Sequence, residues 1–148
     1  MSLKKEPKSE IQVFRNNIDK FVNQLINIYP DDKDLKIYRD KVNAFASINP
    51  RGMVEYFMSN VQPYVAHIME RNEDFFLKDL NPDNVIENQK YRILFDKIKL
   101  LWEGGMTDDT KQTVWQYFTV FVTLGSIITK DQKSIDVINQ YRSKKITL

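Results

Sequence analysis

The sequence predicts an all-α fold: a compact single-domain bundle of five to seven helices around a buried, uncharged central helix at about residues 110–129. Residues 112–129 contain no charged side chain, although charged residues make up 28% of the chain. The flanking segments repeat apolar residues every three or four positions, as amphipathic helices do. The chain also has only four Gly, which disfavours a turn-rich β-protein.

The first helix is predicted to begin at Ser9, which together with Gln12 fits a capping box. Its apolar stripe should pack along the central helix, and Pro30 should end it, because the residue before a proline avoids the helical region. Asp31 or Asp32 can then cap a second helix. The two stripes consist of Ile11, Phe14, Ile18, Phe21, Leu25 and Ile28, and of Leu35, Tyr38, Val42 and Phe45.

Prolines and glycines set the boundaries of the later helices. Asn49 and Pro50 predict a helix start, since proline fits the first helical position. Pro63 must kink or break that helix. Three residues, Asn81, Pro82 and Asp83, are predicted to open the next helix, which Gly104 and Gly105 terminate. After the central helix, a short last helix is predicted from residue 134 to about residue 141, and Phe75 and Phe76 should tether the middle of the chain to the core.

The chain length of 148 residues fits one domain, predicted to span residues 9–141. Basic tails are predicted at residues 1–8 and 142–148. The first tail carries a charge of +2 and the second a charge of +3. Because the whole chain has a net charge of +2, the body carries −3. Weak candidates for phosphate contacts lie in these tails: Lys4, Lys5, Lys8, Arg142, Lys144 and Lys145.

We expect neither secretion nor a membrane span. The N-terminus is polar and lacks the apolar run of a signal peptide. Residues 112–129 are at the lower limit for crossing a bilayer, and seven of them are Gln, Thr or Ser, which favours a core helix. The absence of Cys excludes disulfides, thiolate metal sites and cysteine nucleophiles.

No catalytic, cofactor or metal motif is recognisable, so the sequence predicts that the protein is not an enzyme and has no cofactor or metal. The only histidine, His67, is interpreted as a partly buried helix residue with one hydrogen bond. The aspartates at 31, 32, 34, 108 and 109 lie at expected helix starts, where carboxylates cap free N–H groups. The acidic residues around Arg71 indicate a solvated helix end rather than a carboxylate pair.

Aromatic residues gather around Gly104 and Gly105, and two interpretations remain open for them. Helical spacing favours a place in the core. Alternatively, Trp102, Trp115 and Tyr117 form a partner-binding groove between helices. Trp115 lies off the apolar stripe of the central helix, so it would be an exposed anchor if that side of the helix were uncovered.

Three stretches of the chain have a recognisable pattern when they are taken together: IYPDDKDLKIYRDKV, VQPYVAHIMERNEDFFL and FDKIKLLWEGGMTDDTKQTVWQYFTVFVTL. They resemble a family of small uncharacterised proteins in large nucleocytoplasmic DNA viruses of algae and amoebae. The resemblance covers about residues 21–128 and rests on a Pro-Asp-Asp-x-Asp-Leu helix start, an acidic Phe-Phe segment and a Trp-x-Tyr central helix in this order. It implies a viral all-helical module and assigns no activity, ligand or functional residue.

From these observations we expect a non-enzymatic helical protein that acts as a protein-interaction or virion-associated structural module, in the virion or the host-cell cytoplasm. A protein partner or self-association is expected. The alternative is a nucleic-acid-associated factor that contacts phosphates through its basic tails. A third class, an enzyme with carboxylates in a helical cleft, has the least support from motifs.

Overall fold

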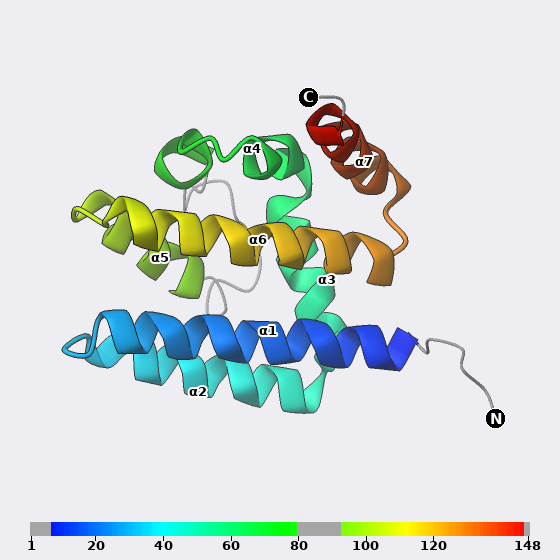
Figure 1. Cartoon of the computed structure of the whole chain (residues 1–148). Helices are drawn as coiled ribbons and strands as arrows, with labels where there is room; N and C mark the ends of the chain where they lie inside the picture. Colours follow the sequence, from blue (N-terminus) through cyan, green and yellow to red (C-terminus); the bar gives the residue numbers. More distant parts are fainter. Residues whose placement is uncertain (1–6, 80–92, 147–148) are drawn as a thin grey trace.

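The computed structural model describes residues 7–79 and 93–146, which form helices and contain no strand (Figure 1). The predicted all-α class is therefore confirmed. The α-helices are α1 (Pro7–Ile28), α2 (Lys33–Ile48), α3 (Pro50–Val61), α4 (Val65–Met69), α5 (Ile93–Glu103), α6 (Asp108–Ile128) and α7 (Gln132–Ile146). A 3₁₀ turn, η1 (Gln62–Tyr64), and a π turn, η2 (Phe75–Asp79), connect them.

Most of the predicted boundaries of the first three helices are confirmed. The Asp32 carboxylate accepts a hydrogen bond from the backbone N–H of Asp34 at the start of α2, at 3.1 Å. The Asn49 side chain accepts one from Gly52 N–H at 2.9 Å, and Pro50 follows it as the first helical residue. The predicted cap at Ser9 is wrong, because α1 already begins at Pro7.

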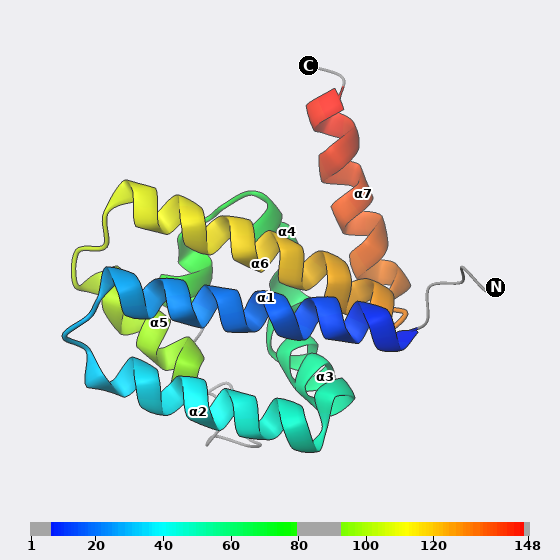
Figure 2. The ribbon, with the colours of Figure 1, turned by 60° about the horizontal axis from the view of Figure 1, so that its bottom comes forward.

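The core lies where α1, α3 and α6 meet. α1 and α6 lie side by side, as predicted for the first helix and the central helix, and they run in opposite directions (Figures 1 and 2). α3 crosses behind them (Figure 1). The ring centroid of Phe121 is 5.5 Å from Phe14 and 5.6 Å from Phe57, and Phe118 lies 6.0 Å from Phe21. Aromatic contacts thus join helices that are far apart in sequence.

A glycine allows α3 to approach α6 closely. A Cβ atom at Gly125 would lie 2.6 Å from Met58 Sδ and 2.8 Å from Met58 Cγ. Gly105, with φ +100°, follows the end of α5 in a conformation that glycine adopts readily, so the predicted stop at the glycine pair is confirmed. Pro63 lies in η1, where α3 gives way to α4 as predicted.

The predicted burial of α6 on every side is wrong for one face. Its apolar positions from Val114 to Ile128 pack mostly inward, and α6 contacts α1, α3, α4 and α7. One stripe nevertheless faces solvent and consists of Gln112, Gln116, Val120 and Ile127. Gln112 and Gln116 supply the polar half of this stripe, while Val120 and Ile127 are exposed apolar residues, which are common on protein surfaces.

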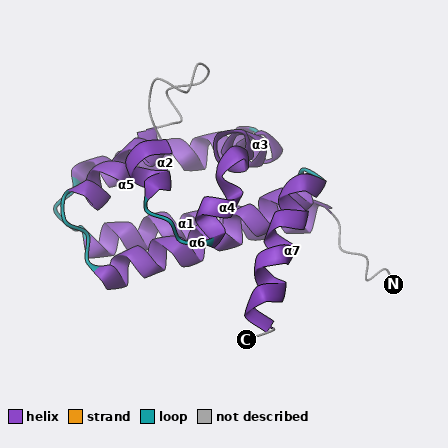
Figure 3. Ribbon diagram, turned by 90° about the horizontal axis from the view of Figure 1, so that it is seen from above, coloured by secondary structure: helices purple, strands orange, loops and turns teal. Residues whose placement is uncertain are grey.

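The last helix is longer than predicted. α7 continues to Ile146 instead of ending near residue 141, so the tail predicted to begin at residue 142 is helical through residue 146. α7 projects away from the rest of the bundle (Figures 2 and 3). The helix start predicted at Asn81, Pro82 and Asp83 lies outside the described residues.

Candidate partner-binding site

The two tryptophans proposed for partner binding lie in the core. Trp102 and Trp115 are only 4% and 2% exposed, and their ring centroids lie 5.3 Å apart in an edge-to-face arrangement. Phe76 of η2 stacks on Trp102 at 4.5 Å and contacts Trp115 at 5.1 Å. The hypothesis that Trp115 is an exposed anchor is therefore wrong, because η2 covers that side of α6.

Tyr117 is half-buried and turned toward α1. Its ring centroid lies 5.1 Å from that of Phe21, and its hydroxyl donates a hydrogen bond to Oε1 of Gln24 at 3.0 Å. The aromatic residues around the glycine pair therefore do not form an open groove. Among them, Tyr117 has the most solvent contact, at the seam between α1 and α6.

The charged segment after α4 holds η2 against the tryptophans. Glu73 accepts hydrogen bonds from Lys111 Nζ at 2.8 Å and from Trp102 Nε1 at 3.0 Å, and Lys111 lies 5.3 Å from the centre of the Trp102 ring. The hydrogen bonds from Lys111 and then Trp102 lower the pKa of Glu73. The helix end interpreted as merely solvated is thus a contact between η2, α5 and α6.

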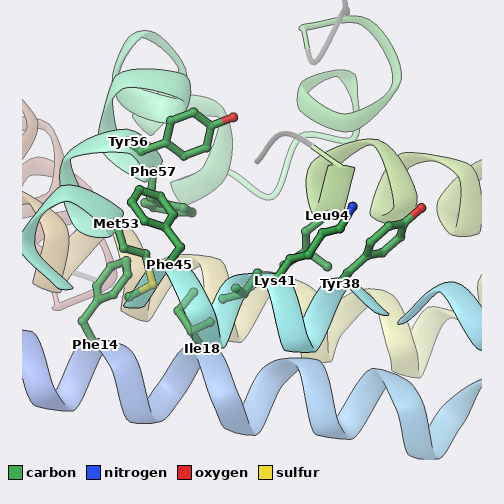
Figure 4. A pocket seen from close by; sticks show the side chains of 10 residues that line it. Phe14, Ile18, Tyr38, Lys41, Phe45, Met53, Tyr56, Phe57 and Leu94 are labelled. Atoms are coloured by element: carbon green, nitrogen blue, oxygen red, sulfur yellow. The ribbon is translucent and has the colours of Figure 1, made fainter. Parts of the chain in front are cut away.

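An apolar pocket opens on another face of the molecule, between α1, α2, α3 and α5 (Figure 4). Its lining residues come from four helices that are separate in the sequence. Its described lining residues include no Asp, Glu or His. They are Phe14, Ile18, Tyr38, Lys41, Val42, Phe45, Met53, Tyr56, Phe57 and Leu94.

The size of this pocket suits a side chain better than a cofactor. Its volume is about 60 Å³, whereas small-molecule sites usually measure roughly 300–1,000 Å³. For comparison, an engineered apolar cavity of about 150 Å³ binds benzene. The pocket can therefore accept one apolar group inserted from outside.

The polar atoms of the pocket lie at its rim. Figure 4 shows Phe14 and Ile18 rising from α1, while the amine of Lys41 and the hydroxyls of Tyr38 and Tyr56 lie at the ends away from α1. Lys41 is exposed and both tyrosines are half-buried. Burial, followed by the negative charge of Asp34, raises the pKa of Tyr38, so this tyrosine remains a neutral hydrogen-bonding group.

The outer face of α2 continues this surface. Ile37 and Ile48 are 50% and 85% exposed, and Ala44 is exposed between them. With Lys41 they are spaced by four, three and four residues, which places them on one stripe of the helix. We call Ile37, Lys41, Ala44 and Ile48 the α2 stripe. It shares Lys41 with the pocket and so borders it.

The aspartates before α2 serve the fold, as predicted, and also bind a lysine. Lys97 Nζ lies 2.5 Å from the Asp32 carboxylate and 3.6 Å from that of Asp34. Burial alone would lower the pKa of Lys97, but the hydrogen bond and charge of Asp32, with the charge of Asp34, outweigh it and raise this pKa.

Within residues 7–79 and 93–146, no three His, Cys, Asp or Glu residues gather as a metal site would require. His67 is half-buried beside Tyr64.

The six residues proposed for phosphate contacts are described only in part. Lys4 and Lys5 lie outside the described residues, while Lys8 lies in the first turn of α1. Arg142 is exposed on α7, and Lys144 and Lys145 belong to the same helix. The prediction of phosphate binding is thus neither supported nor contradicted by their arrangement.

Comparison with protein-family models, curated proteins and solved structures finds no match to this chain. None of the helices described over residues 7–79 and 93–146 has the length and apolar character needed to cross a bilayer.

Proposed function

We propose that the protein is a non-enzymatic protein-interaction or virion-associated structural module that binds an amphipathic helix of a partner protein. The observation that carries this proposal is the apolar pocket between α1, α2, α3 and α5, together with the α2 stripe beside it. Pocket and stripe form one continuous surface, which suits a helix that inserts one apolar side chain and packs others alongside.

The chemistry of the surface specifies the partner. The pocket favours an apolar side chain, because Phe14, Ile18 and Phe57 are among its lining residues and are buried. Ile37 and Ile48 favour further apolar residues on the same side of the partner helix, and the small side chain of Ala44 permits close approach. Lys41 at the rim favours an acidic residue next to the inserted group.

The proposed place of action rests on the resemblance to viral helical proteins stated above. If the chain is a structural component of a virion, mass spectrometry of purified particles will detect it in stoichiometric amount. Its absence from particles, with abundant protein in host-cell cytoplasm, would restrict the proposal to an intracellular partner.

The binding surface is tested by affinity capture from native-source lysate with the wild type and an Ile37→Lys/Ile48→Lys variant. Both residues are well exposed, so these substitutions leave the fold intact. The matched control is Ile127→Lys, because Ile127 is similarly exposed on α6.

We expect a partner that is retained by the wild type and the control and lost with the α2 variant. A synthetic helix from that partner should then bind the purified protein one to one in calorimetry, and an Asp or Glu to Lys change beside its apolar anchor should weaken binding. A partner retained equally by all three proteins overturns this assignment of the surface.

A further inference from the structure

The junction between α6 and α7 is a helix stop with an unusual residue. Lys130 N–H donates to the carbonyl of Ile127 at 3.2 Å, and Asp131 N–H donates to that of Ser126 at 2.9 Å. This is the Schellman pattern, in which a left-handed residue ends the helix. Glycine usually occupies this position, but here it is Lys130, with φ 56°. A residue with a Cβ atom adopts this conformation only at a cost in free energy.

Nothing in the sequence of this junction forbids a continuous helix. Residues 126–146 contain neither glycine nor proline. The stop is held by the turn itself and by Asp131, whose carboxylate accepts hydrogen bonds from the Ser134 N–H at 3.2 Å and the Ser134 hydroxyl at 2.7 Å. If Lys130 became right-handed, α6 and α7 could join into one helix.

α7 is attached to the bundle along one side only. Its main contacts are with α4 and α6, and it projects from the body (Figures 2 and 3). Ile138 is buried, and the Tyr141 hydroxyl donates to the Glu70 carboxylate at 2.5 Å. A hollow of about 310 Å³ remains between α7 and the η1–α4 segment, with Ala66 and Val137 among its walls. The helix is therefore docked but not tightly packed.

We propose that α7 exchanges between two copies of this chain. In the exchanged dimer Lys130 is right-handed, α6 and α7 form a continuous helix, and each α7 docks on α4 and α6 of the other copy. A second copy is the fitting occupant because it offers each α7 the same contacts that the helix leaves. A monomer with α7 swung free would instead expose Ile138 and its neighbours to water.

Exchange also relieves the left-handed conformation of Lys130 in both chains, while it gives up the capping bonds of Asp131. The balance between these effects decides the population of the dimer. This proposal does not depend on the pocket beside α2, since that surface lies on other helices.

The oligomeric state of hinge variants tests the proposal, by size-exclusion chromatography with light scattering over a range of concentrations. Lys130→Gly favours the turn and should weaken dimerisation by roughly tenfold or more, since each dimer contains two hinges. Lys130→Ala/Asp131→Ala removes the cap and favours a continuous helix, so it should strengthen dimerisation. If both variants and the wild type remain monomers at every concentration, the proposal is overturned.

A disulfide trap distinguishes exchange from any other dimer. Because the chain has no native Cys, only the introduced cysteines can form a disulfide. Ala66→Cys and Val137→Cys are made in separate, differently tagged chains, which are mixed, equilibrated in mild denaturant and oxidised. Exchange predicts an interchain disulfide, because these residues line one hollow. A mixture of Ala66→Cys with Ser47→Cys, an exposed α2 residue, measures random oxidation.

An interchain bond no more frequent than in that control overturns the exchange, even if the protein is dimeric. The Ile37→Lys/Ile48→Lys variant is included in the same series and should dimerise as the wild type does. If this variant keeps the partner, the proposed binding surface is wrong, whereas if it loses the dimer, the exchange of α7 is wrong.

Discussion

Two long basic residues share the backbone position that normally belongs to glycine. Arg71 after α4 and Lys130 after α6 both have φ 56°, and each is followed by a residue whose N–H bonds back across the helix end. At Arg71 the side chain also bonds the Gln112 amide of α6, which helps hold this turn. Among the described residues, the Lys130 side chain has no such contact, so the α6–α7 junction depends on its backbone bonds and the Asp131 cap.

The carboxylate of Glu73 should make stability depend on acid pH. Its pKa is lowered in the folded state by the hydrogen bonds from Lys111 and Trp102. The contribution of Glu73 to the free energy of unfolding is therefore present above the pKa of the unfolded chain, about 4.3. It is lost as the pH falls through the lower pKa of the folded protein. Because the side chain is 48% exposed, we expect no more than about 1 kcal/mol at pH 7.

Urea unfolding of the wild type and Glu73→Gln, followed by tryptophan fluorescence, measures this effect. The stability difference should be present at neutral pH and shrink below about pH 4. Glu103→Gln, at an exposed position near the end of α5, is the matched control and should differ little from the wild type at either pH. A Glu73→Gln effect that stays constant down to strongly acidic pH would contradict the assigned hydrogen bonds.

The helix α6 has two faces with opposite tolerance to charge. Phe118 is 2% exposed and its ring contacts Phe21, Phe57 and Phe76. Loss of a buried Phe side chain alone costs about 3–5 kcal/mol, and Asp would add an unpaired buried charge. Since a domain is stable by roughly 5–15 kcal/mol, we expect Phe118→Asp to unfold the protein.

Gln116→Asp provides the comparison, because Gln116 is exposed on the same helix. Thermal melts followed by circular dichroism should show a cooperative transition for Gln116→Asp and none for Phe118→Asp. A melt of Phe118→Asp that matches the wild type would mean that this stripe of α6 is not the one facing the core.

Element boundaries were predictable where one residue determines them locally. Asn49 with Pro50, Pro63 and the glycine pair each act on the chain through their own backbone chemistry, and each boundary appears where it was predicted. The extension of α7 past residue 141 was missed because its apolar stripe ends there. The backbone can continue a helix through a charged segment without apolar contacts, since Arg, Lys and Ser are compatible with it.

At the scale of the whole molecule, the fold class could be predicted and the binding surface could not. For Trp115 the sequence leaves a core position and an exposed anchor both open, because the residue lies off the main apolar stripe of α6, and only the structure shows that Phe76 from a distant turn covers it. The pocket arises for a related reason. Tyr38, Val42 and Phe45 were correctly assigned to one stripe of α2, yet the space left beside them depends on how four helices meet.

The distribution of charge over the chain makes the nucleic-acid alternative testable as a whole-molecule property. The body of residues 9–141 carries −3 and the two ends carry the excess of positive charge, so any phosphate binding should come from the ends. Truncation is unsuitable, because residues 142–146 belong to α7. The six basic residues of the ends should instead be replaced by Gln: Lys4, Lys5, Lys8, Arg142, Lys144 and Lys145.

If this alternative holds, the wild type binds labelled DNA or RNA in fluorescence anisotropy with an affinity that falls steeply with salt, because each neutralised phosphate contributes about 0.9 to the logarithmic slope for duplex DNA. The six-Gln variant should lose this binding while keeping its melting transition. Lys20→Gln/Lys36→Gln/Lys133→Gln, at exposed lysines of the body, is the control for loss of positive charge away from the ends and should retain most of the binding. If the six-Gln variant binds nucleic acid as the wild type does and the control does not bind, the phosphate contacts lie on the body of the protein. This result would refute the alternative, because the ends would then not be needed for binding.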